Sequence, residues 1–406
     1  MAANHSGPTT VETIGSDFYD DPHSYYRRWR ERGIAHRVRF PDNIVRWVVV
    51  DYAIGRGLLA DSRLHKGIAE LAATMASRTG TLVDSRALVL SDHMLNTDEP
   101  GHTRLRKLVN KAFTTRQVAV LRPRVQEITD ALLDGFADAD EVDLMAAFAN
   151  PLPVAVICEL LGVPFADRDR FQAWTRLLVG VHRLTQDGAA AAIAMHTYLS
   201  ELVRAKQERP ADDLLSRLVL ADDDGDRLTD QELVAMAFLL LVAGHETTVN
   251  LIGNGTLALL RAPAQWRALL ADPAGVPAAI EEFLRFDGPV NMSTERVTAE
   301  PITVGDIEIP AGEFVHVALV GANRDPRRFP DPDELRVDGA AGGHLAFGHG
   351  IHFCVGAPLA RLEAEIAFTT LLARFPGLTL APGAHDPRYQ TSTLIRGLTE
   401  LPVRLH

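Results

Sequence analysis

The feature that most constrains the fold is one long stretch of helical sequence, from Asp230 to about Arg261. Thr229 and Glu232 stand three residues apart at its start. This is the spacing of a capping box, in which each side chain satisfies a backbone N–H at a helix N-terminus. At 1.5 Å per residue the stretch spans about 45 Å, long enough to cross the whole molecule. The sequence therefore predicts a mainly helical (mainly α, α+β) protein built around this helix.

A second short stretch, Phe347 to Gly356, places one thiol where a glycine-rich loop becomes a helix. The residues from Ala357 to Phe375 have helical spacing, so Cys354 lies at or just before a helix N-terminus, where free backbone N–H groups favour the thiolate. Three glycines of the stretch leave room for a flat, bulky group beside the sulfur. A haem face fits such a site, and thiolate ligation of haem iron favours O–O cleavage.

Cys354 by itself allows three other interpretations. A single cysteine near a helix is most often a small buried hydrophobic residue. His344, His349 and His352 could bind zinc together with this thiol, although the spacing lacks the paired Cys-x-x-Cys of structural sites. The thiol could also be the nucleophile of a hydrolase, with a histidine as its base. This motif alone does not decide among them.

The middle of the long helix, Ala243 to Thr248, has the sequence Ala-Gly-His-Glu-Thr-Thr. Glycine and two β-branched threonines are poor choices for helix stability, and a side-chain hydroxyl can intrude on the backbone hydrogen bonds and open a local bulge. We expect an O2-sized notch here, where the adjacent acid and alcohol of Glu246 and Thr247 can relay protons. The alternative is a packing defect that accommodates a neighbouring helix.

Two pairs of polar residues have helical spacing. His102 and Arg106 follow a helix start at Asp98-Glu99-Pro100-Gly101 and lie on one face, since they are four apart. Two donors on one face suit a carboxylate such as a haem propionate. Glu282 and Arg285 are three apart. Taken alone, each pair is equally consistent with an ordinary surface pair.

Three motifs occur in one order along the chain: Ala-Gly-x-Glu-Thr-Thr at 243–248, Glu-x-x-Arg at 282–285, and Phe347-Gly348-x-Gly350-x-x-x-Cys354-x-Gly356. Together they resemble the cytochrome P-450 family, specifically the soluble bacterial type, and the last motif is similar to its haem-ligand signature. The resemblance spans most of the chain. It implies a single domain over residues 1–406 with the cytochrome P-450 fold. That fold has a large helical region and a small antiparallel β region, and residues 1–16 are expected to be a flexible N-terminus.

The resemblance also implies roles for individual residues. Cys354 would ligate the haem iron, Glu246 and Thr247 would deliver protons, and Glu282 and Arg285 would form a buried structural pair behind the cysteine loop. The residues implied to contact the haem or its propionates are His102, Arg106, Ala243, Gly244, Arg296, Phe347, Gly348, His352 and Gly356.

The segment before the cysteine loop departs from the family pattern. Glu334-Leu335-Arg336 replaces an Arg-aromatic-acid sequence, and Gly339 stands where the family frequently has arginine. The third member of the Glu282 and Arg285 network is therefore open, and Arg336 is a hypothesis for it.

For function, the resemblance implies a haem-thiolate monooxygenase that hydroxylates or epoxidises a bulky apolar small molecule. Secondary metabolism of polyketides or macrolides, terpenoids or steroid-like compounds is the expected setting. The implied cofactors are haem b (iron protoporphyrin IX), O2 and electrons from NAD(P)H, which a ferredoxin and a ferredoxin reductase would supply because the chain shows no fused flavin domain. Candidate substrate contacts are Leu240, Ala243, Val290, Met292 and Leu394, and candidate ferredoxin contacts are Lys107, Lys111 and Arg361. A peroxide-driven haem peroxygenase and a non-catalytic haem carrier or sensor are the alternatives.

Composition narrows the classes of partner and compartment. The formal net charge of -12 argues against nucleic acid as a general partner, because phosphate binding needs clustered Lys and Arg. Two cysteines are too few for a disulfide framework and agree with a reducing compartment. The polar N-terminus lacks a signal-peptide pattern, and the longest apolar runs, such as Phe238 to Gly244, fall short of the ~20 residues that span a membrane. We expect a monomeric, cytoplasmic protein without membrane contact.

The remaining elements are expected from periodicity and turn residues. Residues 17–35 predict a helix with an aromatic face, and Val45–Val50 predicts a strand with Val38–Phe40 as its hairpin partner. Residues 63–95 lack a regular period and predict a mobile loop segment. Further predictions are helices within 118–135, 142–161 (closed by Gly162) and 166–208, an acidic turn at 222–226, and short strands within 295–319 and near the C-terminus.

Overall fold

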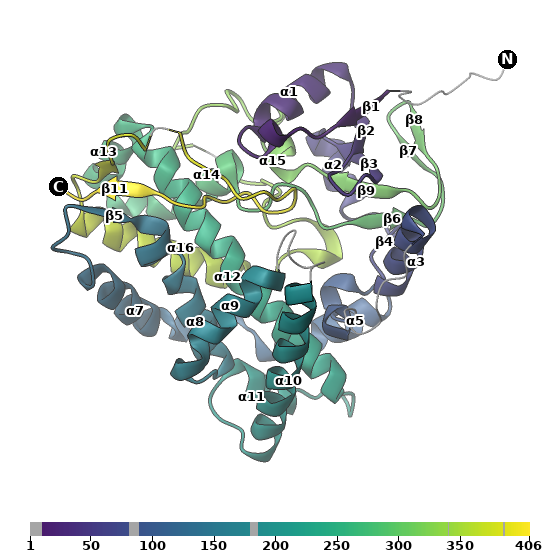
Figure 1. Ribbon diagram of the computed structural model, residues 1–406, viewed down its shortest axis with the longest axis horizontal. Helices are drawn as coiled ribbons and strands as arrows, with labels where there is room; N and C mark the ends of the chain where they lie inside the picture. Colours follow the sequence, from purple (N-terminus) through teal and green to yellow (C-terminus); the bar gives the residue numbers. More distant parts are fainter. Residues whose placement is uncertain (1–9, 81–88, 179–185, 340, 385) are drawn as a thin grey trace.

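The computed structural model describes residues 10–80, 89–178, 186–339, 341–384 and 386–406, which form a helical body with a sheet at one corner (Figure 1). The helices are α1 (Pro22–Arg32), α2 (Tyr52–Leu58), α3 (Ile68–Thr79), α5 (Gly101–Ala112), α6 (Thr115–Val120), α7 (Arg122–Asp134), α8 (Pro151–Leu161), α9 (Arg168–Leu178), α10 (Gln186–Glu208), α11 (Leu214–Leu220), α12 (Asp230–Leu260), α13 (Pro263–Ala271), α14 (Val276–Asp287), α15 (Leu319–Ala322) and α16 (Ala357–Arg374). The strands are β1 (Val11–Thr13), β2 (Ala35–Arg39), β3 (Val45–Val49), β4 (Leu64–His65), β5 (Glu141–Asp143), β6 (Arg296–Thr298), β7 (Ile302–Val304), β8 (Ile307–Ile309), β9 (Phe314–Val317), β10 (Thr379–Leu380) and β11 (Pro402–Arg404). The mainly helical fold with a small β region is confirmed.

Helix α12 runs through the centre of the molecule, as the sequence predicts (Figure 1). Both bonds of its capping box are present: the Glu232 N–H donates to Thr229 Oγ1 at 3.2 Å, and the Thr229 N–H donates to Glu232 Oε2 at 2.8 Å. The helix is long and apolar enough to cross a membrane, but 67% of its most apolar window is buried inside the protein. Such burial is typical of a core helix.

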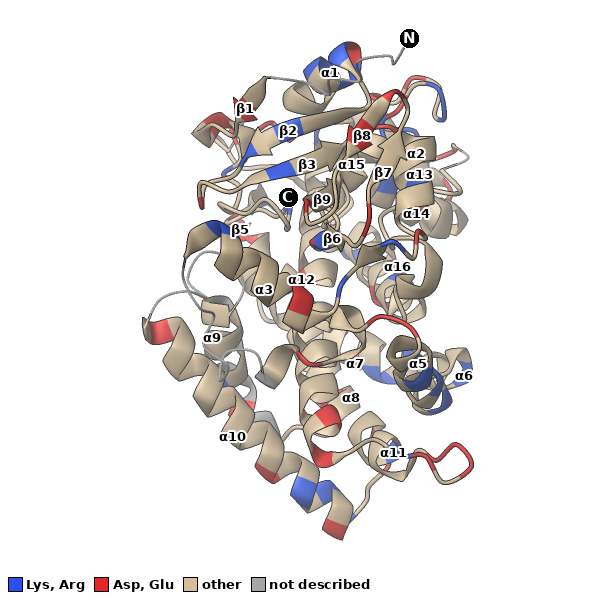
Figure 2. Ribbon diagram, turned by 90° about the vertical axis from the view of Figure 1, so that its right-hand side faces the viewer, with Lys and Arg blue, Asp and Glu red and all other residues tan. Residues whose placement is uncertain are grey.

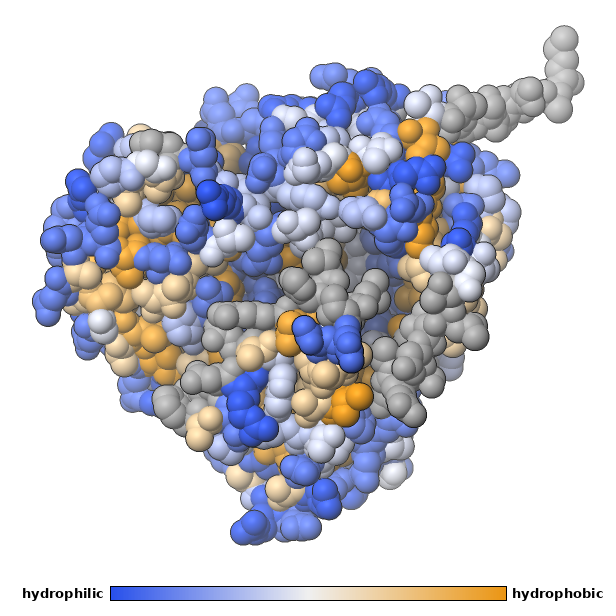
Figure 3. All heavy atoms as spheres, in the orientation of Figure 1, coloured by the Kyte–Doolittle hydropathy of each residue, from blue (hydrophilic) through white to orange (hydrophobic). Residues whose placement is uncertain are grey.

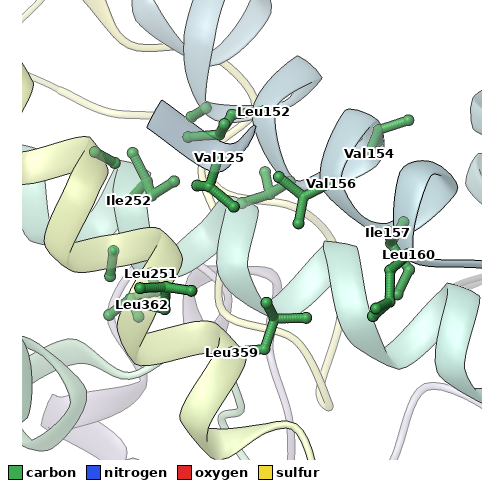
Figure 4. Close-up of a cluster of buried hydrophobic side chains, with 14 of the residues drawn as sticks. Val125, Leu152, Val154, Val156, Ile157, Leu160, Leu251, Ile252, Leu359 and Leu362 are labelled. Atoms are coloured by element: carbon green, nitrogen blue, oxygen red, sulfur yellow. The ribbon is translucent and has the colours of Figure 1, made fainter. Parts of the chain in front are cut away.

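The helical core forms where α8 and α16 pack against α12, and α7 packs against both α8 and α16. Figure 4 shows the side chains gathered there, among them Val125, Val156, Ile252 and Leu362, and all four are buried. Burying one such side chain contributes about 1.5–3 kcal/mol relative to leaving it exposed. By contrast, the face of the molecule drawn in Figure 3 is mostly hydrophilic, with hydrophobic residues in separate patches. The core fixes α16, which begins directly after the cysteine loop, against the C-terminal half of α12, where a Cβ on Gly255 would lie 2.7 Å from Phe368 Cζ.

The main sheet joins segments from both ends of the chain in the strand order β1-β2-β3-β9-β6-β4. β2 and β3 form the predicted antiparallel hairpin, in which Ala35 pairs with Val49 and Arg39 with Val45. β1–β2 and β3–β9 are parallel pairs, so this sheet is mixed rather than purely antiparallel. β1 also takes in part of the segment at 1–16 for which the sequence predicted flexibility, whereas residues 1–9 lie outside the described residues.

The prediction of a mobile loop at 63–95 is wrong for most of the described part of this segment. Residues 64–65 form β4, and Ile68–Thr79 form α3, which ends at Gly80 in left-handed backbone with φ +69°. No residue of α3 is fully buried. Only Leu71 and Met75 of its side chains pack against a buried cluster, so the apolar pattern is too short to reveal the helix. Residues 81–88 lie outside the described part of the chain.

Three predicted helical segments are divided in the structure. Residues 118–135 form parts of α6 and α7, with a proline in the first turn of α7, where its missing N–H costs nothing. The segment 142–161 begins in β5, continues through a π-helical turn at 145–149, and enters α8, which ends at Gly162 with φ +68° as predicted. Residues 166–208 contain α9 and α10, and residues 179–185 between them lie outside the described part.

Candidate functional site

Cys354, the candidate iron ligand, lies at the end of a closed loop. Its backbone N–H donates to the Phe347 carbonyl at 3.0 Å, and α16 begins three residues later. Desolvation raises the pKa of the Cys354 thiol above its usual value. This effect of desolvation is larger than the opposite effect of the backbone N–H groups of Gly356 and Ala357 and of the Arg106 charge, which lower the pKa of the thiol. The helix N-terminus alone therefore does not make Cys354 a thiolate, contrary to the sequence expectation, whereas a bound metal ion would deprotonate it.

Two glycines shape the cysteine loop. Gly348 and Gly350 have φ of +72° and +74°, the left-handed region that favours glycine. A Cβ on Gly350 would lie 2.9 Å from the Cα of Ala60, so this loop also packs closely against the segment that follows α2. These two positions need glycine for the turn, and Cys354 as a residue is partly exposed.

The middle of α12 presents an uncovered face. Most of the helix is buried, but Ala243 is exposed, and Gly244, Glu246 and Thr247 are partly exposed. Ala243 and Thr247 are four residues apart and therefore share one face. The structure thus leaves open the stretch of α12 for which the sequence predicted contact with the haem and O2.

The predicted bulge in α12 is absent, because the helix is continuous from Asp230 to Leu260. The Thr247 hydroxyl donates to the Ala243 carbonyl at 2.9 Å, which gives the hydroxyl a partner without breaking the helix. A Cβ on Gly244 would lie 2.9 Å from Ile157 Cδ1. The alternative interpretation, close packing of a neighbouring helix, therefore accounts for Gly244.

The structure brings several predicted propionate contacts together in one basic group. The rings of His102 and His352 meet edge to face, with 4.4 Å between their centroids. Desolvation lowers the pKa of His352 to about 2, and the charges of Lys66, His102, Arg296 and Arg106 act in the same direction. These side chains come from α5, the cysteine loop, β6 and the residue after β4.

Lys66 and Arg296 are buried without a carboxylate of the described residues as an ion-pair partner. Lys66 is 1% exposed and donates from Nζ to Thr294 Oγ1 at 2.8 Å, and Arg296 is 5% exposed and donates to the Thr294 carbonyl at 3.1 Å. Desolvation lowers the pKa of Arg296 to about 10, and desolvation together with the Arg296 charge lowers the pKa of Lys66 well below its usual value. The nearby carboxylate of Asp98 instead accepts the backbone N–H groups of Lys66 and Gly67.

This basic group suits a ligand that carries carboxylates. Buried charges are normally paired, and an unpaired one is costly. His102 Nδ1 is buried without a hydrogen-bond partner, since Glu99 Oε1 is 3.9 Å away. Haem has two propionates, and Cys354 offers the sulfur donor for its iron. The residues present therefore fit a haem.

Sequence reasoning missed Lys66 and His93. Both are buried, and desolvation lowers the pKa of His93 to about 4 while the Lys66 charge acts in the same direction. The His93 Nδ1 atom has no hydrogen-bond partner. Neither residue belongs to a motif in the sequence. What distinguishes them is burial, and Lys66 lies close to Arg296, which is distant along the chain.

Arg106 is attached to the cysteine loop itself. Its Nη1 donates to the Phe353 carbonyl at 2.8 Å. Together with Asn110, Phe113 and Cys354 it lines a cavity of about 220 Å³. Arg106 therefore supports the backbone next to the sulfur as well as contributing to the basic group.

The Glu282 and Arg285 pair is buried, as the resemblance implied. Arg285 Nε and Nη2 each donate to a Glu282 oxygen at 2.7 Å, and the side chains are 5% and 3% exposed. The remaining donors of Arg285 bond to the carbonyls of Asn323, Pro332 and Glu334. The hypothesis that the Arg336 side chain completes this network is wrong, because its guanidinium is half exposed. Only the backbone N–H of Arg336 reaches Glu282, at 2.9 Å.

The candidate substrate contacts divide into two groups. Ala243 and Leu394 are exposed, and Val290 is partly exposed and pairs with the Leu394 segment through an isolated bridge to Ile395. Met292 is 1% exposed and belongs to a buried aromatic cluster, and Leu240 is buried in the helical core. The structure places Met292 and Leu240 in cores, which sequence hydrophobicity could not separate from a ligand surface.

The three candidate ferredoxin contacts already have partners within the chain. Lys107 and Lys111 lie 2.5 and 2.6 Å from the carboxylate of Asp223. Arg361 donates to both oxygens of Glu281, at 2.6 and 2.9 Å. The basic face that the sequence predicted on α5 is therefore largely neutralised.

The zinc interpretation finds no support in the structure. Among the residues that the structure describes, no three His, Cys, Asp or Glu side chains lie close enough together to hold a metal ion. His344, one of the suggested ligands, instead lies 3.2 Å from Glu281. Cys354 is the candidate ligand that remains.

Comparison with known proteins gives one consistent result. Residues 276–402 match the family model described as Cytochrome P450. Cytochrome P450 monooxygenase PikC of Streptomyces venezuelae is 48% identical over 394 residues, covering 96% of this chain and 92% of that protein. Vitamin D(3) 25-hydroxylase of Pseudonocardia autotrophica is 46% identical over 409 residues, covering 100% and 99%. The solved structure of the tirandamycin C-bound P450 monooxygenase TamI has a TM-score of 0.91 and 48% identity, covering 97% of this chain and 100% of that chain.

Proposed function

Because this chain belongs to the cytochrome P450 family and is one of its monooxygenases, we propose that it hydroxylates or epoxidises a bulky apolar small molecule and that Cys354 ligates the haem iron. The observation that carries the site assignment is the buried basic group beside the cysteine loop. Lys66 and Arg296 lack a carboxylate partner among the described residues, and the haem propionates would supply the missing negative charge. When bound, haem supplies O2 activation with electrons from a redox partner.

Lys66 and Arg296 would hold the cofactor by charge, and His102 and His352 by hydrogen bonds, because desolvation lowers the pKa of both histidines. Lys66, Arg296, His102 and His352 would face its propionates, and Arg106 would hold the Phe353 carbonyl and so keep the cysteine loop in place. The buried Glu282 and Arg285 pair fixes the segment before the loop through backbone carbonyls.

Glu246 and Thr247 are the groups that handle protons on the uncovered face of α12. Glu246 is 17% exposed, and its Oε1 lies 3.9 Å from Nε2 of His245, whose Nδ1 is bonded to the Leu241 carbonyl at 2.8 Å. Desolvation lowers the pKa of His245, so this histidine is neutral at neutral pH. The Thr247 hydroxyl donates to the Ala243 carbonyl and retains its acceptor lone pairs towards the open face. We assign proton delivery to Glu246 and hydrogen bonding at the open face to Thr247.

The substrate surface in this proposal consists of Ala243, Val290 and Leu394. All three are apolar, and Ala243 and Leu394 are exposed in the chain as described. Two similar proteins are named Vitamin D(3) 25-hydroxylase and tirandamycin C-bound P450 monooxygenase TamI. A macrolide, terpenoid or steroid-like compound therefore suits the surface. Spectral titration with a panel of such compounds measures which class binds.

For electron supply we assign a ferredoxin and its reductase, with NAD(P)H as the source of electrons. We also assign the protein to the cytoplasm and infer that it acts as a monomer. Ile351 and Phe353 of the cysteine loop are 46% and 42% exposed, which offers a partner an apolar surface close to Cys354. A partner docked there has the shortest path to the sulfur.

The ligand assignment is tested by the ferrous carbonyl adduct of the purified, haem-loaded protein. A thiolate-type absorption is expected, and Cys354→His should convert it to the imidazole type while His344→Gln, a matched change outside the loop, leaves it unaltered. An imidazole-type spectrum of the intact wild-type protein would overturn the assignment. Turnover with NAD(P)H and redox partners, compared with turnover on peroxide alone, separates the monooxygenase from a peroxygenase.

A further inference from the structure

The basic side chains of α5 are divided between two faces. Arg104, Lys107 and Lys111 lie three and four residues apart and therefore form one stripe, whereas His102 and Arg106 face the cysteine loop and the basic group. The stripe contains Lys107 and Lys111, two of the three predicted contacts of an acidic electron donor; the third, Arg361, lies on α16. Its three cations decide how strongly a negatively charged protein is attracted to this side of the molecule.

An acidic turn of the same chain already occupies this stripe. The turn, Asp222–Asp226, lies between α11 and α12, and Figure 2 shows it as a red loop beside α11. Asp223 lies 2.5 Å from Lys107 and 2.6 Å from Lys111, and Asp226 lies 2.8 Å from Arg104. Arg104 also bonds to Glu232, at 2.6 Å. Each cation of the stripe thus has a carboxylate partner.

The turn is held in this position by its own bonds. Asp223 and Asp226 exchange two backbone hydrogen bonds, at 2.9 and 3.1 Å, and Gly225 donates to Asp222 Oδ1 at 2.9 Å. Asp224 and Gly225 have φ of +56° and +91°, which fixes a tight turn. Lys111 Nζ also donates to the Asp222 carbonyl at 2.8 Å, so the bonds within the turn and this bond together hold the Asp223 carboxylate beside the lysines.

The stripe nevertheless remains within reach of a partner. The Lys107 and Lys111 side chains are 58% and 45% exposed, and the Asp223 side chain is 20% exposed. Arg106, next to Lys107, donates to the carbonyl of Phe353, whose side chain is exposed beside Cys354. A protein that covers the exposed cysteine loop therefore comes next to these lysines and meets them paired to Asp223.

We propose that the acidic turn Asp222–Asp226 is an intramolecular competitor of the electron donor, in which the Asp223 carboxylate takes the place on Lys107 and Lys111 that a carboxylate of an acidic ferredoxin would occupy. This inference rests on the proposed function, since it requires that a ferredoxin docks on this face. Docking then exchanges one set of ion pairs for another, and the net electrostatic gain is smaller than the count of lysines suggests.

The test uses the haem-loaded enzyme and a purified acidic [2Fe–2S] ferredoxin. Asp223→Asn keeps the size of the side chain and removes the carboxylate partner of both lysines, although Lys111 still donates to the Asp222 carbonyl. The bonds from Arg104 to Asp226 and Glu232 still hold the turn. Asp224→Asn is the matched control: it removes the same formal charge one residue away, where the carboxylate acts on Lys107 only through its charge and the ion pairs of both lysines are to Asp223. Reduction is followed by stopped flow as formation of the ferrous carbonyl adduct at a series of ferredoxin concentrations and ionic strengths.

At low ionic strength, Asp223→Asn should lower the ferredoxin concentration for half-maximal reduction roughly two- to fivefold, the range that one exposed ion pair spans. The Asp224→Asn variant measures the part due to net charge alone, and its effect should be clearly smaller. At about 0.5 M salt the difference should disappear, because screening removes interactions between exposed charges. Reduction by dithionite and the urea midpoint report whether the variant is correctly folded. If Asp223→Asn is not correctly folded, the same measurements are made on Asp223→Ser.

The double charge reversal Lys107→Glu with Lys111→Glu separates this inference from the proposed docking. If the reversal weakens ferredoxin-driven reduction but Asp223→Asn behaves like Asp224→Asn, the turn does not compete and the inference is wrong, while docking on α5 stands. If the reversal changes nothing, the ferredoxin docks elsewhere, and both the docking face and the inference are wrong. Weakening by the reversal together with tighter binding of Asp223→Asn supports both.

Discussion

Replacing Glu282 by Gln tests how the buried ion pair behind the cysteine loop supports the fold. Arg285 has two bonds of 2.7 Å to this carboxylate, and both side chains are almost fully buried. The amide keeps the shape but removes the charge, which leaves the guanidinium as an uncompensated buried cation. Breaking such a pair costs about 3–5 kcal/mol, a large part of the ~5–15 kcal/mol by which a typical protein is stable. The expected result is a marked fall in the urea midpoint together with loss of bound haem.

Glu281 is the matched control for this change. It is the adjacent carboxylate on α14, but its side chain is 28% exposed and its partner Arg361 is 39% exposed. Solvent reaches this pair, so Glu281→Gln should cost less than Glu282→Gln, although Glu281 also lies 3.2 Å from His344. The assay is equilibrium urea unfolding, with the midpoint and slope compared among wild type and the two variants.

A second change separates charge from shape. In the double variant Glu282→Leu with Arg285→Met neither charge is buried, so stability should recover in part relative to Glu282→Gln. Recovery should be incomplete, because the carbonyls of Asn323, Pro332 and Glu334 lose the hydrogen bonds that the Arg285 guanidinium donates in the wild type. If Glu282→Gln is no more destabilising than Glu281→Gln, the argument that burial makes this pair critical is refuted.

Three other changes probe separate parts of the molecule. Thr247→Ala should reduce the product formed per electron consumed by roughly tenfold or more, since groups that handle protons contribute ~10²–10⁴ in rate; an unchanged ratio of product to NAD(P)H would remove this residue from the mechanism. Gly350→Ala should be more damaging to haem content and stability than Gly383→Ala. Both glycines have positive φ, +74° and +86°, but only at Gly350 would a Cβ come within 4 Å of other atoms, 2.9 Å from Ala60; equal losses would contradict the packing argument. Desolvation lowers the pKa of His23 to about 4 from 6.5, so the unfolded chain takes up the proton first as the pH falls. Stability from this group is complete above pH 6.5 and is lost towards pH 4, by up to about 3 kcal/mol, and His23→Gln should flatten that slope in urea unfolding measured against pH.

Much of the architecture was predictable because it depends on neighbours in sequence. Thr229 and Glu232 predict the start of α12, since a capping box is made within one turn of helix. The glycines around Cys354 predict a tight loop, and both Gly348 and Gly350 have the left-handed backbone that only glycine adopts easily. The bulge in α12 was predicted from the same kind of local reasoning and is wrong, because the Thr247 hydroxyl finds a carbonyl within an intact helix.

What the sequence by itself determined is therefore the family, the central helix and the cysteine that would hold the iron, all of which depend on short spacings. Only the tertiary structure decided that Lys66 joins the basic group, that Arg285 is completed by backbone carbonyls rather than by Arg336, and that Asp223 neutralises Lys107 and Lys111. Whether a charge is buried, paired or free depends on groups that are far apart along the chain and meet only on folding. The spacing of residues along the chain carries no information about these long-range contacts, whereas burial and distance determine their interaction energy.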